Sequence, residues 1–363
     1  MQLDKKNLIS LIKKLALTPG KSLEESKRLL LIEEFLKKRS INFQKDKADN
    51  IIIPIKQGKK EETIIFDAHT DVAGKGFCEN YEETADIIKG QGCADDLFAV
   101  SMLLFLCEKL KNKNIKKPFT ILLSSGEEGI GNLYGVKNFI SDFNSVPELF
   151  VSFDLSYNTI SFNGLGSKRF ECKIFTKGGH SFEDFGSPNA IETMCSLLNS
   201  IKGKITENFL KDKPTFNAGK INGGTSINLI ADYCLCLFEF RSESQQLLQK
   251  AQDITFKLIK EFESPDIKIE IKDIGSRPGA DCIKKDEILK KIMPVFKKNN
   301  LAPQIKSMST NINAALSKNW PSFCTGLCDC GNFHTENEYI KKDSIDKGWN
   351  LLIGLIKEFG IVC

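Results

Sequence analysis

The 363-residue chain is poor in histidine, with only His69, His180 and His334, and poor in arginine, with five. It has no apolar run approaching the ~20 residues that a membrane-spanning helix needs, so no helix is expected to cross a membrane. The formal net charge of +4 is small for this length, and the lysines are spread along the chain. This argues against a nucleic acid as partner. Because histidine is so rare, each of the three carries information about function.

The chain also lacks the features of an exported protein. Residues 1–17 alternate apolar and basic side chains at helical spacing, without the apolar core of a signal peptide. The twelve cysteines are therefore expected to be reduced thiols, many of them small core residues. Cys234 and Cys236, two apart on an expected strand, should face the same way into a core. We therefore expect a cytoplasmic protein.

What the chain does have is a set of strand-like runs that end in metal-binding residues. The runs and the residues after them are 64–66 before His69 and Asp71, 120–123 before Glu127 and Glu128, and 149–153 before Asp154. In open α/β sheets, ligands bind beyond the carboxyl ends of the strands, so these residues should converge. Histidine and carboxylates brought to one place are typical of a zinc hydrolase.

The order of elements predicts an α/β fold with a mainly parallel sheet sandwiched by helices. Expected helices lie within 1–40, with a break at Pro19, and at 97–110, 132–143, 286–299 and 343–359. Expected strands lie at 50–55, 63–66, 118–124, 149–153, 304–307 and 322–326. The first and last parts of the chain, 1–166 and 275–363, should together form this catalytic domain.

Residues 167–274 follow a different pattern. A strand (168–176), a helix (188–202), two strands (215–221 and 229–240), a helix (244–262) and a strand (266–273) are expected in that order. This βαββαβ order predicts a ferredoxin-like unit inserted into the catalytic domain.

The metal-binding residues can be assigned to a site for two ions, which needs a bridging carboxylate. Asp95, next to Asp96 at a glycine-flanked turn, is the natural bridge. His69 and Asp154 can complete one ion, and Glu128 and His334 the other. Asp71 can hold the His69 imidazole. Glu127, unligated beside Glu128, is the expected general base.

Each of these motifs also has a simpler interpretation. A His-x-Asp after a strand is a common surface turn, a Glu-Glu pair is often a solvated helix start, and an Asp-Asp pair is often an N-cap. Their joint occurrence favours the metal site. A structural zinc site could also be drawn through Cys324-x3-Cys328-x-Cys330-x3-His334, but this spacing does not match the usual paired hooks.

The order of motifs resembles the di-zinc metallopeptidase family of peptidase T, glutamate carboxypeptidase, acetylornithine deacetylase and aminoacylase. The motifs are His69-Thr70-Asp71, Gly92-x2-Asp95-Asp96, Gly126-Glu127-Glu128-Gly129, Asp154, Gly178-Gly179-His180-Ser181, Gly223-Gly224-Thr225-Ser226-x-Asn228 and His334. The resemblance runs through nearly the whole chain. It implies two Zn²⁺ per chain, with Co²⁺ or Mn²⁺ as substitutes, and a cis peptide between Asp95 and Asp96.

The resemblance also implies roles for the inserted unit. It would be a lid that mediates homodimerisation and supplies His180 to the substrate's carbonyl oxygen in the partner subunit's site. Asn228 and Arg241 look like the lid residues that hold the substrate backbone or carboxylate. The alternatives are turn residues for His180 and Asn228 and a surface arginine for Arg241.

One departure from the family pattern concerns substrate preference. Many members carry Ser-Thr-Asp-x-Asn where this chain has Ser309-Thr310-Asn311-Ile312-Asn313. We expect an exopeptidase that cleaves di- or tripeptides. The alternatives are an amidohydrolase that deacylates N-acyl amino acids, with the same metals and base, and a non-catalytic binding protein on this fold.

Overall fold

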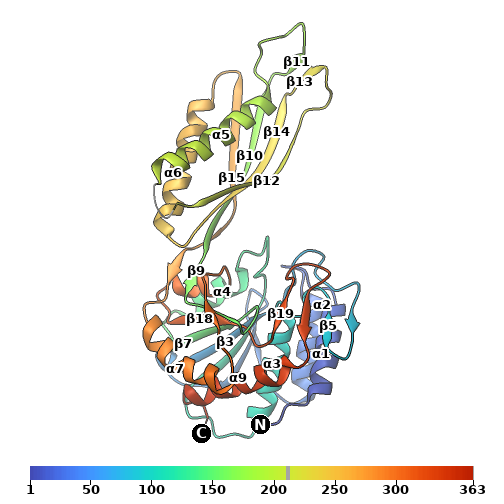
Figure 1. Cartoon of the computed structure of the whole chain (residues 1–363), viewed down its shortest axis with the longest axis vertical. Helices are drawn as coiled ribbons and strands as arrows, with labels where there is room; N and C mark the ends of the chain where they lie inside the picture. The colour runs from blue at the N-terminus through green and yellow to red at the C-terminus, as the bar shows by residue number, and fades with distance from the viewer. Residues whose placement is uncertain (210–212, 363) are drawn as a thin grey trace. The chain divides into compact units, whose positions relative to one another are not determined.

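The computed structural model describes residues 1–209 and 213–362, which form two compact units. Unit 1 comprises Met1–Gly164 and Asp281–Cys363, and unit 2 is Leu165–Ala280 (Figure 1). The sequence pattern placed the inserted segment at 167–274. Within the described part of the chain, no helix is both long and apolar enough to cross a membrane.

Unit 1 is built on an eight-stranded sheet of order β1-β2-β6-β3-β7-β18-β8-β17. Its strands are β1 (Gln44–Lys45), β2 (Ile51–Lys56), β3 (Ile64–His69), β6 (Phe119–Ser124), β7 (Leu149–Phe153), β8 (Thr159–Ser161), β17 (Gln304–Ile305) and β18 (Ser322–Thr325). The central pairs β6–β3, β3–β7 and β7–β18 are parallel, whereas β1 and β2 join antiparallel at one edge. The predicted mainly parallel sheet is confirmed.

Helices and aromatic side chains bury this sheet. The helices of unit 1 are α1 (Lys5–Leu17), α2 (Ser26–Lys38), α3 (Leu97–Leu110), α4 (Tyr134–Phe143), α7 (Lys285–Lys298), α8 (Ile312–Leu316) and α9 (Ser344–Glu358). The almost wholly apolar α3 packs against α1, β3 and β6, while α8 packs against β7 and β18. Phe66 meets Phe119 and Phe153 edge to face, each at 5.0 Å between ring centroids. Each such buried ring contributes about 1.5–3 kcal/mol.

A second, small sheet joins two loops of unit 1. Its order is β19-β20-β5-β4, with β19 at Cys330–Gly331, β20 at Tyr339–Lys341, β5 at Ile87–Lys89 and β4 at Glu82–Glu83. Strand β20 pairs antiparallel with β5, so Ile340 lies opposite Ile88. The pairing ties the segment after His334 to the segment before Asp95.

Unit 2 contains the βαββαβ order predicted from its sequence. The elements are β10 (Gly166–Thr176), α5 (Ala190–Asn208), β12 (Thr215–Gly223), β14 (Tyr233–Ser242), α6 (Gln245–Phe262) and β15 (Ile267–Arg277). The sheet order β12-β14-β10-β15 is antiparallel throughout, which is the arrangement of a ferredoxin-like sheet. Cys234 and Cys236 are fully buried in the core between this sheet and its two helices, as expected.

One strand of unit 2 differs from its prediction. The expected strand 229–240 is divided into β13 (Leu229–Ile230) and β14, which begins at Tyr233. Strand β13 pairs with β11 (Gly179–His180) rather than with the main sheet. The division gives the chain a separate two-stranded ribbon that carries His180.

Candidate active site

Three parallel strands deliver acidic and histidine side chains to one edge of the unit 1 sheet. His69 is the last residue of β3, Glu127 and Glu128 follow β6, and Asp154 follows β7. All four residues are buried, at 8% exposure or less. This is the convergence that the strand endings predicted.

Asp95 lies between His69 and His334. Its peptide bond to Asp96 is cis, as the family resemblance implies. One carboxylate oxygen of Asp95, Oδ1, is 3.0 Å from His69 Nε2, and Oδ2 is 3.0 Å from His334 Nε2. His334 Nε2 is also 2.9 Å from Glu128 Oε1. Asp95 therefore faces both sets of side chains.

The potential ligands fall into groups whose donor atoms lie within 4.8 Å of one another. One group is His69, Asp95 and Asp154, and a second is Asp95, Glu128 and His334. A third combines His69 with Glu127 and Glu128. Within the described ranges none of these groups contains a cysteine, so His334 is placed with carboxylates and not in the cysteine hook considered above.

The burial and charge of these side chains fit divalent cations. Among the described residues, the buried Oδ1 atom of Asp154 has no hydrogen-bond partner. Burial, reinforced by the charge of Asp95, raises the pKa of Asp154 well above its ordinary value. Burial also acts to raise the pKa of Asp95, but hydrogen bonds from His334 and His69 outweigh it and lower this pKa. Such clustered, buried carboxylates need a positive charge nearby.

Asp71 connects the two loops that follow β3 and β6. Its fully buried carboxylate accepts the backbone N–H of Glu127 at 3.0 Å and that of Glu128 at 2.8 Å. His69 Nδ1 lies 3.1 Å from the Asp71 carbonyl oxygen and 3.3 Å from the Asp71 carboxylate. Because Nδ1 faces only acceptors, it carries the proton, and Nε2 is left to bind a metal.

Arg28 is a supporting residue whose role the sequence did not reveal. Its fully buried guanidinium, on α2, donates to the backbone carbonyls of Leu15, Thr18, Gly20, Thr70 and Gly76. Thr70 stands between His69 and Asp71, so the bond to its carbonyl steadies the metal-binding loop. The helical spacing of the sequence could have indicated that Arg28 is buried, because it lies on the same helix face as the buried Ile32 and Phe35.

A second overlooked residue is Asp67, in the middle of β3. Its fully buried carboxylate accepts from the hydroxyls of Ser124 at 2.7 Å and Ser152 at 2.9 Å, and from the Asn311 amide at 2.9 Å. Burial raises the pKa of Asp67, while these three donors act to lower it. Asn311, where the family resemblance leads one to expect aspartate, is therefore a neutral donor to a buried carboxylate on β3.

In unit 2 the structure brings His180 and Asn228 together. Strand β11 pairs with β13, and the Ser181 N–H donates to the Asn228 carbonyl at 3.1 Å. The N–H groups of Phe182 and Glu183 both point at His180 Nδ1, at 3.3 Å. Nδ1 is therefore an acceptor, and the proton of a neutral ring lies on the other nitrogen, Nε2.

Arg241 lies elsewhere in unit 2. It pairs with Ser167 at one end of β10, whereas Tyr233 pairs with Phe175 at the other end, towards His180. The strand from Tyr233 to Arg241 spans roughly 26 Å at ~3.3 Å per residue. The Arg241 guanidinium is also bound to both carboxylate oxygens of Glu239, at 2.7 and 3.2 Å.

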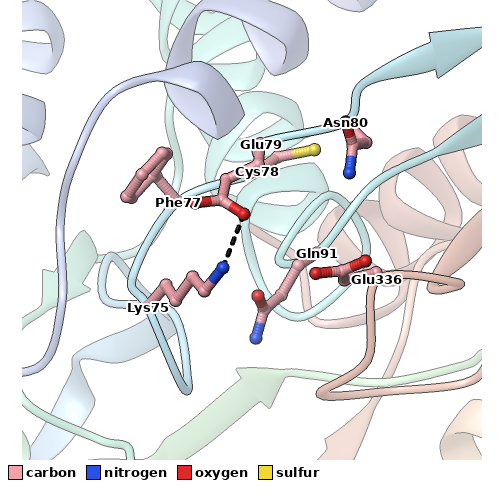
Figure 2. A pocket seen from close by; sticks show the side chains of 7 residues that line it. All are labelled: Lys75, Phe77, Cys78, Glu79, Asn80, Gln91 and Glu336. Carbon is pink, nitrogen blue, oxygen red and sulfur yellow. Dashed lines mark hydrogen bonds and ion pairs between the residues drawn. The ribbon is translucent and has the colours of Figure 1, made fainter.

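A small pocket lies on the segments that flank the metal-binding loops (Figure 2). It is lined by Lys75, Phe77, Cys78, Glu79, Asn80, Gln91 and Glu336. Its volume is ≈ 10 Å³, which is about the room that one water needs. Lys75 and Glu79 form an ion pair at 2.6 Å across it. This pocket is too small for a peptide side chain.

Taken together, the parallel sheet and the buried His-carboxylate cluster at its edge define a metal-dependent hydrolase. The chain belongs to the peptidase family M20/M25/M40, which it matches over residues 65–358. This finding confirms the resemblance seen in the sequence motifs.

Individual relatives are diverse. Acetylornithine deacetylase of Buchnera aphidicola subsp. Acyrthosiphon pisum is 24% identical over 289 residues, covering 76% of this chain and 74% of that protein. Among solved structures, a Staphylococcus aureus tripeptidase matches with a TM-score of 0.80 at 16% identity, covering 99% of this chain and all of that one. Aminopeptidase PepT of Bacillus cereus matches with a TM-score of 0.76 at 17% identity, covering 98% and 99%. These structures confirm the fold class.

Proposed function

We propose that the protein is an exopeptidase that hydrolyses short peptides with two zinc ions per chain, for which Co²⁺ or Mn²⁺ can substitute. The observation that carries this proposal is the buried Asp95 carboxylate, shared by two ligand groups, with Glu127 beside them. His69, Asp95 and Asp154 would hold one ion, and Asp95, Glu128 and His334 the other. A cytoplasmic location stays a prediction from the sequence.

Each residue of the site has a distinct task in this proposal. When bound, the two cations would lower the pKa of a water and polarise the scissile carbonyl. Glu127 would take the proton of the attacking water and pass it to the leaving amine. Asp71 would keep Glu127 in place through its backbone N–H and hold His69 in the correct tautomer. His180 would donate from Nε2–H to the oxyanion, and Asn228 would bind the substrate backbone.

The separation within unit 2 supports a homodimer as the active form. An extended dipeptide is only about 7 Å long, much shorter than the roughly 26 Å between the strand ends near His180 and Arg241. The two side chains of one chain therefore cannot hold the same short substrate. A dimer in which unit 2, acting as lid, supplies His180 to the partner subunit's site removes this conflict. Arg241 would then have to exchange Glu239 for the substrate carboxylate.

Subunit mixing tests this arrangement. Inactive His180→Ala and Glu127→Gln chains, refolded together, should recover about a quarter of wild-type activity, because about half of the dimers are mixed and each has one intact site. Each variant refolded alone, at the same total protein concentration, is the control. Recovery of no activity, with subunit exchange shown by differently tagged chains, would contradict the action of His180 in the partner's site.

A second function is deacylation of N-acyl amino acids, favoured by the acetylornithine deacetylases among the sequence relatives. The same metals and the same base would serve it. Purified protein should be assayed on tripeptides, dipeptides and N-acetyl amino acids, each with and without chelator. Chelator-sensitive release of an amino acid from peptides supports the exopeptidase, and turnover of the N-acetyl compounds alone would replace it with the deacylase.

A further inference from the structure

Glu338 is a buried carboxylate that holds the loop carrying Asp95. Its side chain is almost fully buried, and it immediately precedes β20. Oε1 accepts the backbone N–H of Ala94 at 2.8 Å and of Asp95 at 3.0 Å, and Oε2 accepts the N–H of Gly92 at 3.0 Å. The carbonyl oxygen of Glu338 also accepts the Gly90 N–H at 2.8 Å. One residue therefore binds four backbone N–H groups of a single loop.

The loop is shaped to present these N–H groups. Gly92 has φ of +77°, a conformation that favours glycine, and a Cβ there would lie 2.4 Å from the Val72 side chain. The turn at Gly92 lets three nearby N–H groups converge on one anion, as in other backbone anion sites. Next to this loop, the pairing of β20 with β5 fixes the segment after His334 to the segment before Asp95. Glu338 extends that connection from the strands to Asp95 itself.

This contact couples both sides of the metal site. Asp95 bears the carboxylate shared by the two ligand groups, and His334 stands four residues before Glu338 on the other loop. Because the Asp95 N–H is fixed by Glu338, the direction of the Asp95 side chain depends on Glu338. A carboxylate is required here, because both of its oxygens accept from the loop. A glutamine at this position would turn an NH₂ group towards a backbone N–H.

We propose that Glu338 is a positioning residue for the metal centre, which orients the Asp95 loop so that the shared carboxylate faces both ions. The proposal rests on the proposed function, in which Asp95 bridges two cations. It assigns to Glu338 no contact with metal or substrate. Groups of this kind, which orient metal ligands, typically change metal affinity or activity by ~10–100-fold when replaced.

The test is a metal titration of full-length, metal-free protein with Zn²⁺ against a chromogenic chelator. Glu338→Gln should weaken Zn²⁺ binding by ~10–100-fold, and at both sites because Asp95 belongs to both groups. Glu336→Gln is the matched control, since it removes the same charge from an exposed position two residues away and should bind as wild type. Glu338→Asp, which keeps the charge but shortens the reach, should lie between Glu338→Gln and wild type.

Hydrogen exchange gives a second readout that does not need metal. In folded, metal-free protein, the amides of residues 92–95 should exchange faster in Glu338→Gln, and in Glu338→Asp if the glutamine variant does not fold. Wild-type Zn²⁺ affinity together with unchanged exchange would overturn the proposal, as would a loss of thermal stability with unaltered affinity. Those outcomes leave the proposed function standing. It fails instead if wild-type protein binds no Zn²⁺ or hydrolyses none of the substrates above.

Discussion

Changing Asn311 to aspartate should destabilise unit 1 by an amount that depends on pH. The Asn311 amide nitrogen lies 2.9 Å from Oδ2 of the fully buried Asp67. The substitution would place two carboxylates at that distance, where their repulsion at an effective dielectric constant of about 20 is about 6 kcal/mol. The pair can lower this cost by binding a proton. Holding a proton at pH 7 on a group with an ordinary pKa of ~3.9 costs about 4 kcal/mol. Because this is less than the repulsion, it sets the upper limit on the loss of stability.

The pH dependence follows from the same argument. The pKa of the paired carboxyls in the folded variant is raised above the unfolded value, so the loss of stability grows as the pH rises from about 4 towards 7. We expect Asn311→Asp to lose about 4 kcal/mol relative to wild type at pH 7 and about 1.5 kcal/mol at pH 5. Adding Asp67→Asn restores one carboxylate and one amide and should bring stability to within about 1.5 kcal/mol of wild type.

Urea unfolding followed by tryptophan fluorescence measures this effect, because both tryptophans, Trp320 and Trp349, are buried in unit 1. Asn319→Asp, at an exposed position beyond the same short helix α8, is the control and should change stability by less than ~0.5 kcal/mol. Equal destabilisation of Asn311→Asp at both pH values would refute the reasoning. So would a double variant no more stable than the single one.

Three further predictions concern the catalytic groups and their supports. Glu127→Gln should lower turnover by at least ~10²–10⁴ without changing metal content by mass spectrometry, because Glu127 lies outside both groups that share Asp95; a loss of metal would make it a ligand. Arg28→Met should lower the free energy of unfolding by roughly 2–6 kcal/mol, because the Thr18 and Thr70 carbonyls each lose a hydrogen bond, at about 1–3 kcal/mol per carbonyl. The control Arg39→Met removes a half-exposed ion pair and should cost under ~1 kcal/mol. Equal losses in the two variants would contradict this. Chelation should abolish hydrolysis, and two equivalents of Zn²⁺ per chain should be needed to restore it; full recovery with one would contradict a bridging Asp95.

Those parts of the fold that depend on local pattern could be predicted from the sequence. Helix α3 and strand β7 have the expected bounds, because each is a mainly apolar run with polar residues next to it. Helix α5 was expected to end at 202 but continues to Asn208, because the buried spacing of Leu197, Ile201 and Ile205 carries on past that point.

Features that depend on long-range pairing could not be predicted. The strands β4, β5, β19 and β20 are two or three residues long, too short to show a period of two. They form because segments distant in sequence meet. For the same reason the sequence pattern predicts no strand within 82–89 and a single strand at 229–240, where the structure has two. A strand of two residues is determined by its partner rather than by its own sequence.

The candidate site shows the same division. The order of motifs was sufficient to nominate His69, Asp95, Glu128, Asp154 and His334, and the structure brings these five together. Asp71 was predicted to support the His69 imidazole, and it lies beside that ring. Its bonds to the Glu127 and Glu128 amides, and those of Glu338 to the Asp95 loop, were not predicted, because they join a side chain to distant backbone. Every residue except proline carries a backbone N–H, so the residue types do not reveal which N–H groups bind a carboxylate.

The spread of the ligands along the chain has a consequence for biosynthesis. His69, Asp95 and Asp154 all belong to the first half of the chain, whereas His334 and its neighbour Glu338 come near the end. At a synthesis rate of ~5–20 residues per second, the residues of one ligand group are all synthesised roughly 10–40 s before His334. A nascent or prematurely terminated chain lacks Glu338 as well as His334, so if Glu338 orients Asp95 as proposed, neither ligand group that shares Asp95 is fully arranged in it. In the proposed mechanism, hydrolysis would therefore begin only after residues 334–338 have been made, and shorter products would be inactive.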